Sequence, residues 1–300
     1  MQYYYKAFGW NICSEMELPE LWKGDPQKKA DVNICLSEVP EKLEGCVKKG
    51  IGYQIKPEHY ILSISGVARY MVIKGEEIRL EIEKDAHLDE VKVFLYASVF
   101  GALSHLRGAL PLHASAIKYN KRIILFAGNT GAGKSTIAAA FQKKGFEVLS
   151  DDLVPVFFSP EKKPITSKGI ARMKLWAEAL EKMNISYNGK SKIRGEIEKY
   201  HVPVQAKEEP DSSFISTLFV LEPYPGKDIE LIDVRGRERL SYLINNTFRY
   251  QLLEGFGLKE WHFTMCTQLL KHIQLIRVRQ PRAEYKLEEL VTAVEQRLEA

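Results

Sequence analysis

The eight residues Gly128–Ser135 read GNTGAGKS, and they constrain this chain more than any other segment. They match the phosphate-binding pattern G-x-x-x-x-G-K-[ST] at every fixed position. The apolar run 122–127 before them predicts a buried strand, and residues 136–141 after them predict a helix. A chance match to the pattern rarely falls between such a strand and such a helix. The segment therefore predicts an α/β fold with a P-loop, rather than a glycine-rich structural turn.

The residue types of this loop suit a nucleoside triphosphate. The glycines allow backbone N–H groups to turn inward on a phosphate without Cβ clashes. The helix N-terminus adds partial positive charge and Lys134 adds a full one, while the Ser135 hydroxyl can bind a Mg²⁺ ion shared with the β- and γ-phosphates. The residues expected to contact the nucleotide are Gly128, Asn129, Thr130, Gly131, Ala132, Gly133, Lys134, Ser135 and Thr136.

Composition narrows the class of protein. The 300 residues are 45% hydrophobic and 27% charged, as in a globular protein with one large domain or two ordinary ones. A net charge of +4 is too small to indicate a nucleic-acid partner. The four cysteines form no C-x-x-C pair, which argues against a zinc site and indicates a reducing cytoplasm. No signal peptide is expected, and the longest apolar run, 93–106, is too short to span a bilayer.

Three regions follow one another along the chain. Residues 1–84 alternate apolar and polar side chains between glycines, which predicts a strand-rich N-terminal domain. Residues 85–107 predict a linking helix that Asp85 caps and Gly108 ends, with an apolar stripe along one side. Residues 108–300 hold the P-loop and predict the catalytic domain.

Two pieces of predicted geometry bring further groups to the P-loop. Strand 146–149 follows the P-loop helix, and if it lies parallel beside strand 122–127, both end at the same sheet edge. Asp151 and Asp152 come directly after it and should face the phosphates. Strand 112–117 is expected to form a hairpin with 122–127, which places His113 near the entrance of the loop.

The acid pair suits phosphoryl transfer, because one carboxylate can accept the proton of an attacking hydroxyl while the other holds the metal. The alternative is that both acids cap a loop or lie in solvent. For His113, a satisfied core histidine is an equally good explanation. Glu222 is either a further acid near the metal or a solvent-exposed strand end. Five cations are candidates for binding phosphate or a peptide carboxylate, or are simply surface charges: Arg172, Lys199, Arg235, Arg237 and Arg249.

The run His113-Ala114-Ser115, the P-loop and the run Leu149–Asp152 together resemble, in order and spacing, the catalytic half of HPr kinase/phosphorylase. The resemblance covers residues 108–160 well and extends more loosely towards residue 285. It implies a P-loop domain akin to phosphoenolpyruvate carboxykinase, with a mixed sheet. It also implies that Asp151 is the general base on an acceptor serine, supported by His113. Lys134 would bind phosphate, Ser135 would bind magnesium, and Asp152 would bind the metal or act as a proton-relay partner.

The chain departs from that family in two places. Thr136 stands where the bifunctional members carry Glu, and no Glu-x-Arg-Gly signature is present, which argues against phosphorolysis and hexameric regulation. A homo-oligomer of another kind stays open. The opening residues 8–21 are similar to shorter HPr-kinase-like proteins of ribosomal-peptide biosynthesis, which include lasso-peptide kinases.

We therefore expect a kinase that uses ATP and Mg²⁺ to phosphorylate a serine of a peptide or small protein, such as a lasso-type precursor peptide. Two alternatives remain open at this point. One is a P-loop ATPase or nucleotide-gated binding module that makes no phosphorylated product. The other is a small-molecule kinase that acts on free serine or a sugar.

Overall fold

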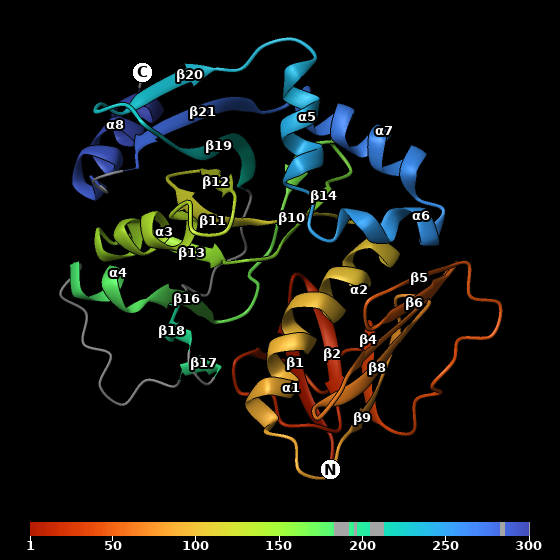
Figure 1. The fold of residues 1–300 in the computed structure, drawn as a ribbon. Helices are drawn as coiled ribbons and strands as arrows, with labels where there is room; N and C mark the ends of the chain where they lie inside the picture. Colours follow the sequence, from red (N-terminus) through yellow and green to blue (C-terminus); the bar gives the residue numbers. More distant parts are fainter. Residues whose placement is uncertain (183–191, 195–196, 205–212, 283–285, 300) are drawn as a thin grey trace.

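The computed structural model describes residues 1–182, 192–194, 197–204, 213–282 and 286–299. The first 82 residues form a nine-stranded sheet with the order β3-β1-β2-β4-β9-β8-β7-β6-β5, red to orange in Figure 1. Its pairs are antiparallel except β2–β4 and β4–β9, which are parallel. The strands are β1 (Tyr3–Ala7), β2 (Trp10–Ser14), β3 (Trp22–Lys23), β4 (Val32–Leu36), β5 (Lys48–Gly50), β6 (Tyr53–Lys56), β7 (His59–Ile64), β8 (Ala68–Ile73) and β9 (Glu77–Ile82).

A long helical stretch connects this sheet to the rest of the chain (Figure 1). It consists of α1 (Leu88–Phe94), the π-helical turn η1 (Leu95–Val99) and α2 (Phe100–Leu106). It begins later than predicted, because His87 still has extended backbone angles and takes the N-cap position expected for Asp85. Gly108, at φ +70°, follows its end as expected. The predicted apolar stripe is buried against the N-terminal sheet at Val91, Leu95, Val99 and Leu103.

The second large sheet is mixed and has the order β13-β11-β12-β19-β21-β20. The predicted hairpin is confirmed, with Ala114 opposite Ala127. The predicted adjacency of the two strands flanking the P-loop helix is wrong, because the hairpin strand lies between them and pairs antiparallel with both. Both flanking strands run opposite to the hairpin strand, so they still end at the same sheet edge. The strands are β11 (Ala114–Tyr119), β12 (Arg122–Gly128), β13 (Glu147–Ser150), β19 (Phe214–Tyr224), β20 (Glu230–Asp233) and β21 (Gln274–Pro281).

Helices cover both faces of this mixed sheet, which gives an α/β architecture. On one face α3 (Lys134–Lys143) and α8 (Leu287–Glu299) pack over apolar side chains that include Phe126. On the other face α5 (Glu238–Asn245) and α7 (Lys259–Leu270) pack over the alternate side chains, which include Leu125. In the described part of the chain, no helix is both long and apolar enough to cross a membrane.

Two three-stranded sheets complete the fold, with the orders β10-β14-β15 and β16-β18-β17. Met173 and Leu175 of β16 are buried in the same core as α3, so the side chains between them face the other way. This alternation directs Lys174 towards the end of β13. The remaining elements are β10 (Leu110–Leu112), β14 (Val154–Phe158), β15 (Pro164–Ile165), β16 (Arg172–Trp176), β17 (Lys192–Arg194), β18 (Ile197–Pro203), α4 (Ala177–Lys182), η2 (Tyr250–Leu252) and α6 (Leu253–Phe256).

Candidate active site

The P-loop lies between β12 and α3, as its sequence requires. Gly128 has φ +136°, and a Cβ there would lie 2.5 Å from the backbone oxygen of Leu221, so only glycine fits. Gly133, at φ +95°, starts the helix. The Lys134 ammonium donates to the carbonyl oxygens of Gly128 at 2.8 Å and Asn129 at 3.2 Å. The lysine is therefore folded over the loop, where its charge would meet a bound phosphate.

Two side chains from distant segments hold this loop. The Asn246 Oδ1 accepts the N–H of Gly128 at 2.9 Å, and its Nδ2 donates to the Tyr242 carbonyl at 2.8 Å. On the other side Gln280 Nε2 donates to the Ala132 carbonyl at 2.6 Å. Because both holders are buried, the loop is fixed in shape by the strands and helices around it.

Asp151 is buried beside the first turn of α3. Its Oδ1 accepts the Ser135 hydroxyl at 2.8 Å and the Ser115 hydroxyl at 2.6 Å. Its Oδ2 accepts the backbone N–H of Lys174 at 3.1 Å. Three donors therefore fix this carboxylate against the serine of the P-loop.

Asp152 turns to the opposite side, because its backbone is left-handed with φ +74°. Its Oδ2 accepts the Lys174 ammonium at 3.0 Å, and its Oδ1 lies 3.2 Å from His113 Nδ1. Burial alone would raise the pKa of the Asp152 carboxyl, but the charge of Lys174 and the hydrogen bond from His113 outweigh it and hold that pKa well below its usual range. Asp152 is therefore an anion at neutral pH.

The contacts of His113 fix its tautomer. Nδ1 lies 2.9 Å from the carbonyl oxygen of Asp152 and 3.2 Å from its carboxylate, and both groups only accept hydrogen bonds. Nδ1 must therefore carry a proton, which leaves Nε2 of the neutral ring with a free lone pair. The ring packs against Phe248, with centroids 5.6 Å apart. These contacts orient the His113 ring. Its side chain is 28% exposed, so it is not fully buried as a core histidine would be.

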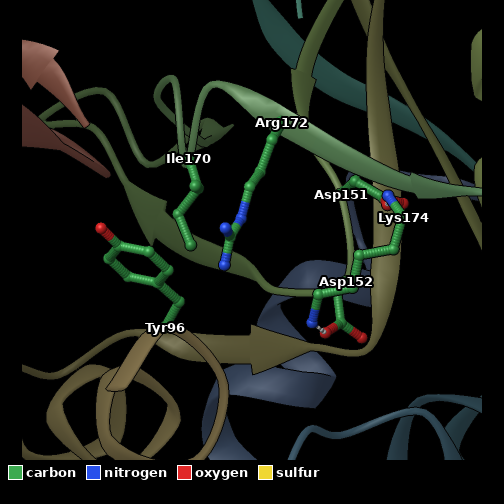
Figure 2. A pocket seen from close by; sticks show the side chains of 6 residues that line it. All are labelled: Tyr96, Asp151, Asp152, Ile170, Arg172 and Lys174. Atoms are coloured by element: carbon green, nitrogen blue, oxygen red, sulfur yellow. Dashed lines mark hydrogen bonds and ion pairs between the residues drawn. The ribbon is translucent and has the colours of Figure 1, made fainter. Parts of the chain in front are cut away.

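A small cavity of about 10 Å³ lies beside the acid pair. Figure 2 shows its lining, with Arg172 extending between Tyr96 and the two aspartates. This volume holds about one water molecule. This cavity is therefore too small for a sugar or an amino acid.

The donor chemistry fits magnesium. The Ser135 hydroxyl and the Asp151 carboxylate are hard oxygen ligands within hydrogen-bond distance of each other. In the described residues, no group of three or more His, Cys, Asp or Glu side chains is placed to hold a metal. One hydroxyl and one carboxylate are enough protein ligands for Mg²⁺, which usually keeps several waters and binds substrate phosphates.

The other predicted residues are placed differently. Glu222 lies 4.0 Å from Arg277, on the far side of the P-loop strand from the acid pair. Arg249 donates to Ser98 of the connecting helix at 2.6 Å. Arg235 and Arg237 are exposed in the turn before α5, and the side chain of Lys199 lies outside the described part of the chain. Thr136 is buried in the first turn of α3.

Sequence reasoning missed Lys174 and Asn246. The alternation in the segment 172–176 signals a strand with 172 and 174 on one face, and that pattern selects Lys174 once the strand is placed beside the acids. Asn246 carries no comparable signal, because its role depends on a helix end meeting a strand more than 100 residues earlier.

Comparison with known proteins adds little to this geometry. No protein-family model and no curated protein matches the chain. Among solved structures, the Hpr(Ser) kinase/phosphatase from Coxiella burnetii is similar over 63% of this chain and 91% of its own length, at 12% identity and a TM-score of 0.31. The functional conclusion therefore rests on the residues of the site itself.

Proposed function

We propose that this protein is a P-loop phosphotransferase that moves the γ-phosphoryl group of ATP to a serine hydroxyl on a peptide or small protein. The observation that carries the proposal is the meeting of two units at one sheet edge. The first is Ser135 bound to Asp151 at 2.8 Å, and the second is His113 bound to Asp152. We further propose that the core is akin to that of phosphoenolpyruvate carboxykinase, as the sequence resemblance implies.

The contacts favour roles for the two aspartates that differ from those inferred from the sequence. Asp151 is bound to the P-loop serine, so it joins Ser135 as the holder of magnesium in place of Asp152. When bound, Mg²⁺ neutralises charge that develops on the phosphates. Three hydrogen bonds keep the Asp151 carboxylate in position for this role, and they leave it poorly placed to take a proton from an acceptor.

His113 is the better general base. Its Nε2 lone pair is free among the described residues, and Asp152 holds the ring in that tautomer. During transfer the acceptor O–H bond breaks and its proton moves to Nε2. A bond forms from the acceptor oxygen to the γ-phosphorus, and the bond from that phosphorus to the β–γ bridging oxygen breaks. The electron pair of that bond leaves with ADP, and the anionic Asp152 stabilises the imidazolium.

Two lysines supply positive charge to the phosphates. Lys134 lies over the loop, and its carbonyl partners are weaker acceptors than a phosphate oxygen would be. Lys174 lies on the acid side and bonds to Asp152 at 3.0 Å. Positioning and charge neutralisation of this kind supply most of the catalysis in phosphoryl transfer.

The choice of acceptor rests on the shape of the site. The cavity beside the acids holds only about one water molecule, so it cannot itself enclose a small acceptor, and we propose that the hydroxyl is presented from outside the protein. This favours a serine on a peptide or protein surface over a free sugar or amino acid. A ribosomally made precursor of the lasso type is one member of that class.

The test is intact-mass spectrometry of serine-containing peptides, lasso-type precursors among them, after incubation with the protein, ATP and Mg²⁺. We expect one peptide to gain the mass of a single phosphoryl group, and its serine-to-alanine version to stay unmodified. Accumulation of ADP with every peptide unchanged would replace the kinase with an ATPase. Transfer to free serine or a sugar would make the acceptor a small molecule.

A further inference from the structure

A second and much larger cavity opens on the other side of the P-loop. It has a volume of about 520 Å³, within the range of small-molecule binding pockets. Four of its lining residues belong to the loop itself, namely Gly128, Asn129, Thr130 and Ala132. The cavity is therefore continuous with the surface on which phosphates would lie.

The cavity forms where three parallel strands end. Gly128 closes β12, the segment 221–223 lies at the carboxyl end of β19, and Arg282 follows β21. Ligands of open α/β sheets bind outside the carboxyl ends of such strands. Residues from the end of α5, the helix that packs on one face of the sheet, form the rest of the wall.

The position of the cavity gives the bound nucleotide a direction. β12 lies in the middle of the sheet order, with β13 and its two aspartates to one side and β19 and β21 to the other. Ser135 and Asp151 mark the end of the loop where the terminal phosphate would react. The opposite end of the same triphosphate then points towards β19 and β21, into this cavity.

We infer that this cavity binds the nucleoside, ribose and base, of the triphosphate. The inference rests on the proposed function, because it assumes that the P-loop holds the phosphates.

The lining has the chemistry for this ligand. Tyr242 supplies an aromatic ring to the lining of the cavity. Asn245 is exposed, and among the described residues its amide is available to donate and accept hydrogen bonds. Arg282 adds a positive charge on the β21 side of the cavity. An aromatic surface with a few polar groups is the usual make-up of a cofactor site.

The experiment compares ATP with inorganic tripolyphosphate, which carries the phosphates without the nucleoside. Isothermal titration calorimetry measures both affinities for the wild type, Asn245→Trp and Tyr242→Ala. Asn245→Trp fills the cavity from an exposed position, and Ser241→Trp is the matched control, because Ser241 is exposed on the same helix and does not line the cavity. We expect both cavity variants to lose at least about tenfold in affinity for ATP while tripolyphosphate binding and the control stay unchanged.

The other outcomes separate the two claims. Cavity variants that bind ATP as tightly as the wild type overturn the nucleoside site and leave the P-loop function intact. An equal loss of affinity for ATP and for tripolyphosphate in the cavity variants also overturns the nucleoside site, because the substitutions would then weaken phosphate binding by the P-loop. A wild-type protein that binds neither ligand overturns the proposed function, and the nucleoside site with it.

Discussion

His113 is the residue on which the chemistry depends most. Its Nδ1 proton is held by Asp152, so only Nε2 can accept the proton of an acceptor. The substitution His113→Asn keeps an amide N–H near the position of Nδ1 and removes the atom that we assign to proton transfer. The two roles of the ring, structural and chemical, can therefore be separated at this position.

We expect His113→Asn to lower kcat for transfer by roughly a hundredfold to ten-thousandfold, the usual contribution of a general base. ATP affinity should stay within about twofold, because the polar contacts of the ring among the described residues go to Asp152 and not to the P-loop. Steady-state kinetics and calorimetry on one preparation measure both quantities. A His113→Asn protein with wild-type kcat would return the role of base to one of the aspartates.

The segment 246–248 is the element that ties the site together. Asn246 holds Gly128 of the P-loop, and the carbonyl of Asn246 accepts the backbone N–H of His113 at 2.7 Å. Two buried histidines brace this segment: His262 contacts Thr247 Oγ1 at 2.8 Å, and His105 donates to the Phe248 carbonyl at 2.9 Å. Both imidazoles are buried, so a proton added to either would place a charge away from water, and the stability of this segment depends on their staying neutral.

That dependence predicts acid lability. Burial lowers the pKa of both His105 and His262 to about 4. Below the ordinary histidine pKa the unfolded chain binds more protons than the folded protein, so stability falls as the pH drops from about 6.5 towards 4. Each of the two histidines should lower the free energy of unfolding by about 2 kcal/mol between pH 7 and pH 5. Asp152, with its lowered pKa, contributes to acid lability only at lower pH.

Urea unfolding at several pH values measures this slope. We expect His262→Gln, which keeps a hydrogen-bonding side chain beside Thr247 and cannot titrate, to flatten the slope between pH 7 and pH 5. His272→Gln is the control, because His272 is exposed. Equal slopes in the wild type and His262→Gln would show that the histidine is not the cause.

How much the sequence could predict depended on the range of each interaction. The P-loop and the hairpin that brings His113 beside it follow from local patterns, and the structure has them where expected. The order of strands does not follow locally: β11 lies between β12 and β13 because hairpin pairing occupies the place beside β12. The contacts of the two aspartates depend on the left-handed backbone at Asp152, and the neighbouring residues in the sequence do not predict that conformation.

At the scale of the whole molecule, the N-terminal sheet is joined to the acid pair through β16. Arg172 of β16 lies 3.2 Å from Glu20, and its guanidinium stacks 4.9 Å from the ring centre of Tyr96 in the π-helical turn. The Tyr96 hydroxyl also donates to Glu20 at 2.9 Å. Lys174, two residues along the same strand, contacts both aspartates. The position of β16 thus depends on the N-terminal sheet and affects the site.

The Glu20–Arg172 pair should therefore matter to folding. The side chains are 19% and 9% exposed, so removing the acid leaves a buried cation without its partner. We expect Glu20→Ala to lower the free energy of unfolding by about 3 kcal/mol. The double substitution Glu20→Leu with Arg172→Met should recover part of that loss, because it removes the buried cation as well, while the Tyr96 hydroxyl still loses its acceptor.

Chemical denaturation of the single and double variants measures the coupling. Glu289→Ala is the control, because it breaks an exposed pair with Lys286 and should change stability by less than about 1 kcal/mol. A Glu20→Ala protein as stable as this control would mean that the N-terminal sheet and β16 are not coupled through the pair.

The central claim is that the P-loop binds the phosphates of ATP with magnesium held at Ser135. The most direct measurement is calorimetric titration of ATP, with and without Mg²⁺, into the wild type, Lys134→Ala and Ser135→Ala. We predict that the wild type binds ATP, that Lys134→Ala loses at least about tenfold in affinity, and that Ser135→Ala loses the enhancement by Mg²⁺. Equal ATP binding by the wild type and Lys134→Ala, or none by a folded wild type, would contradict the account.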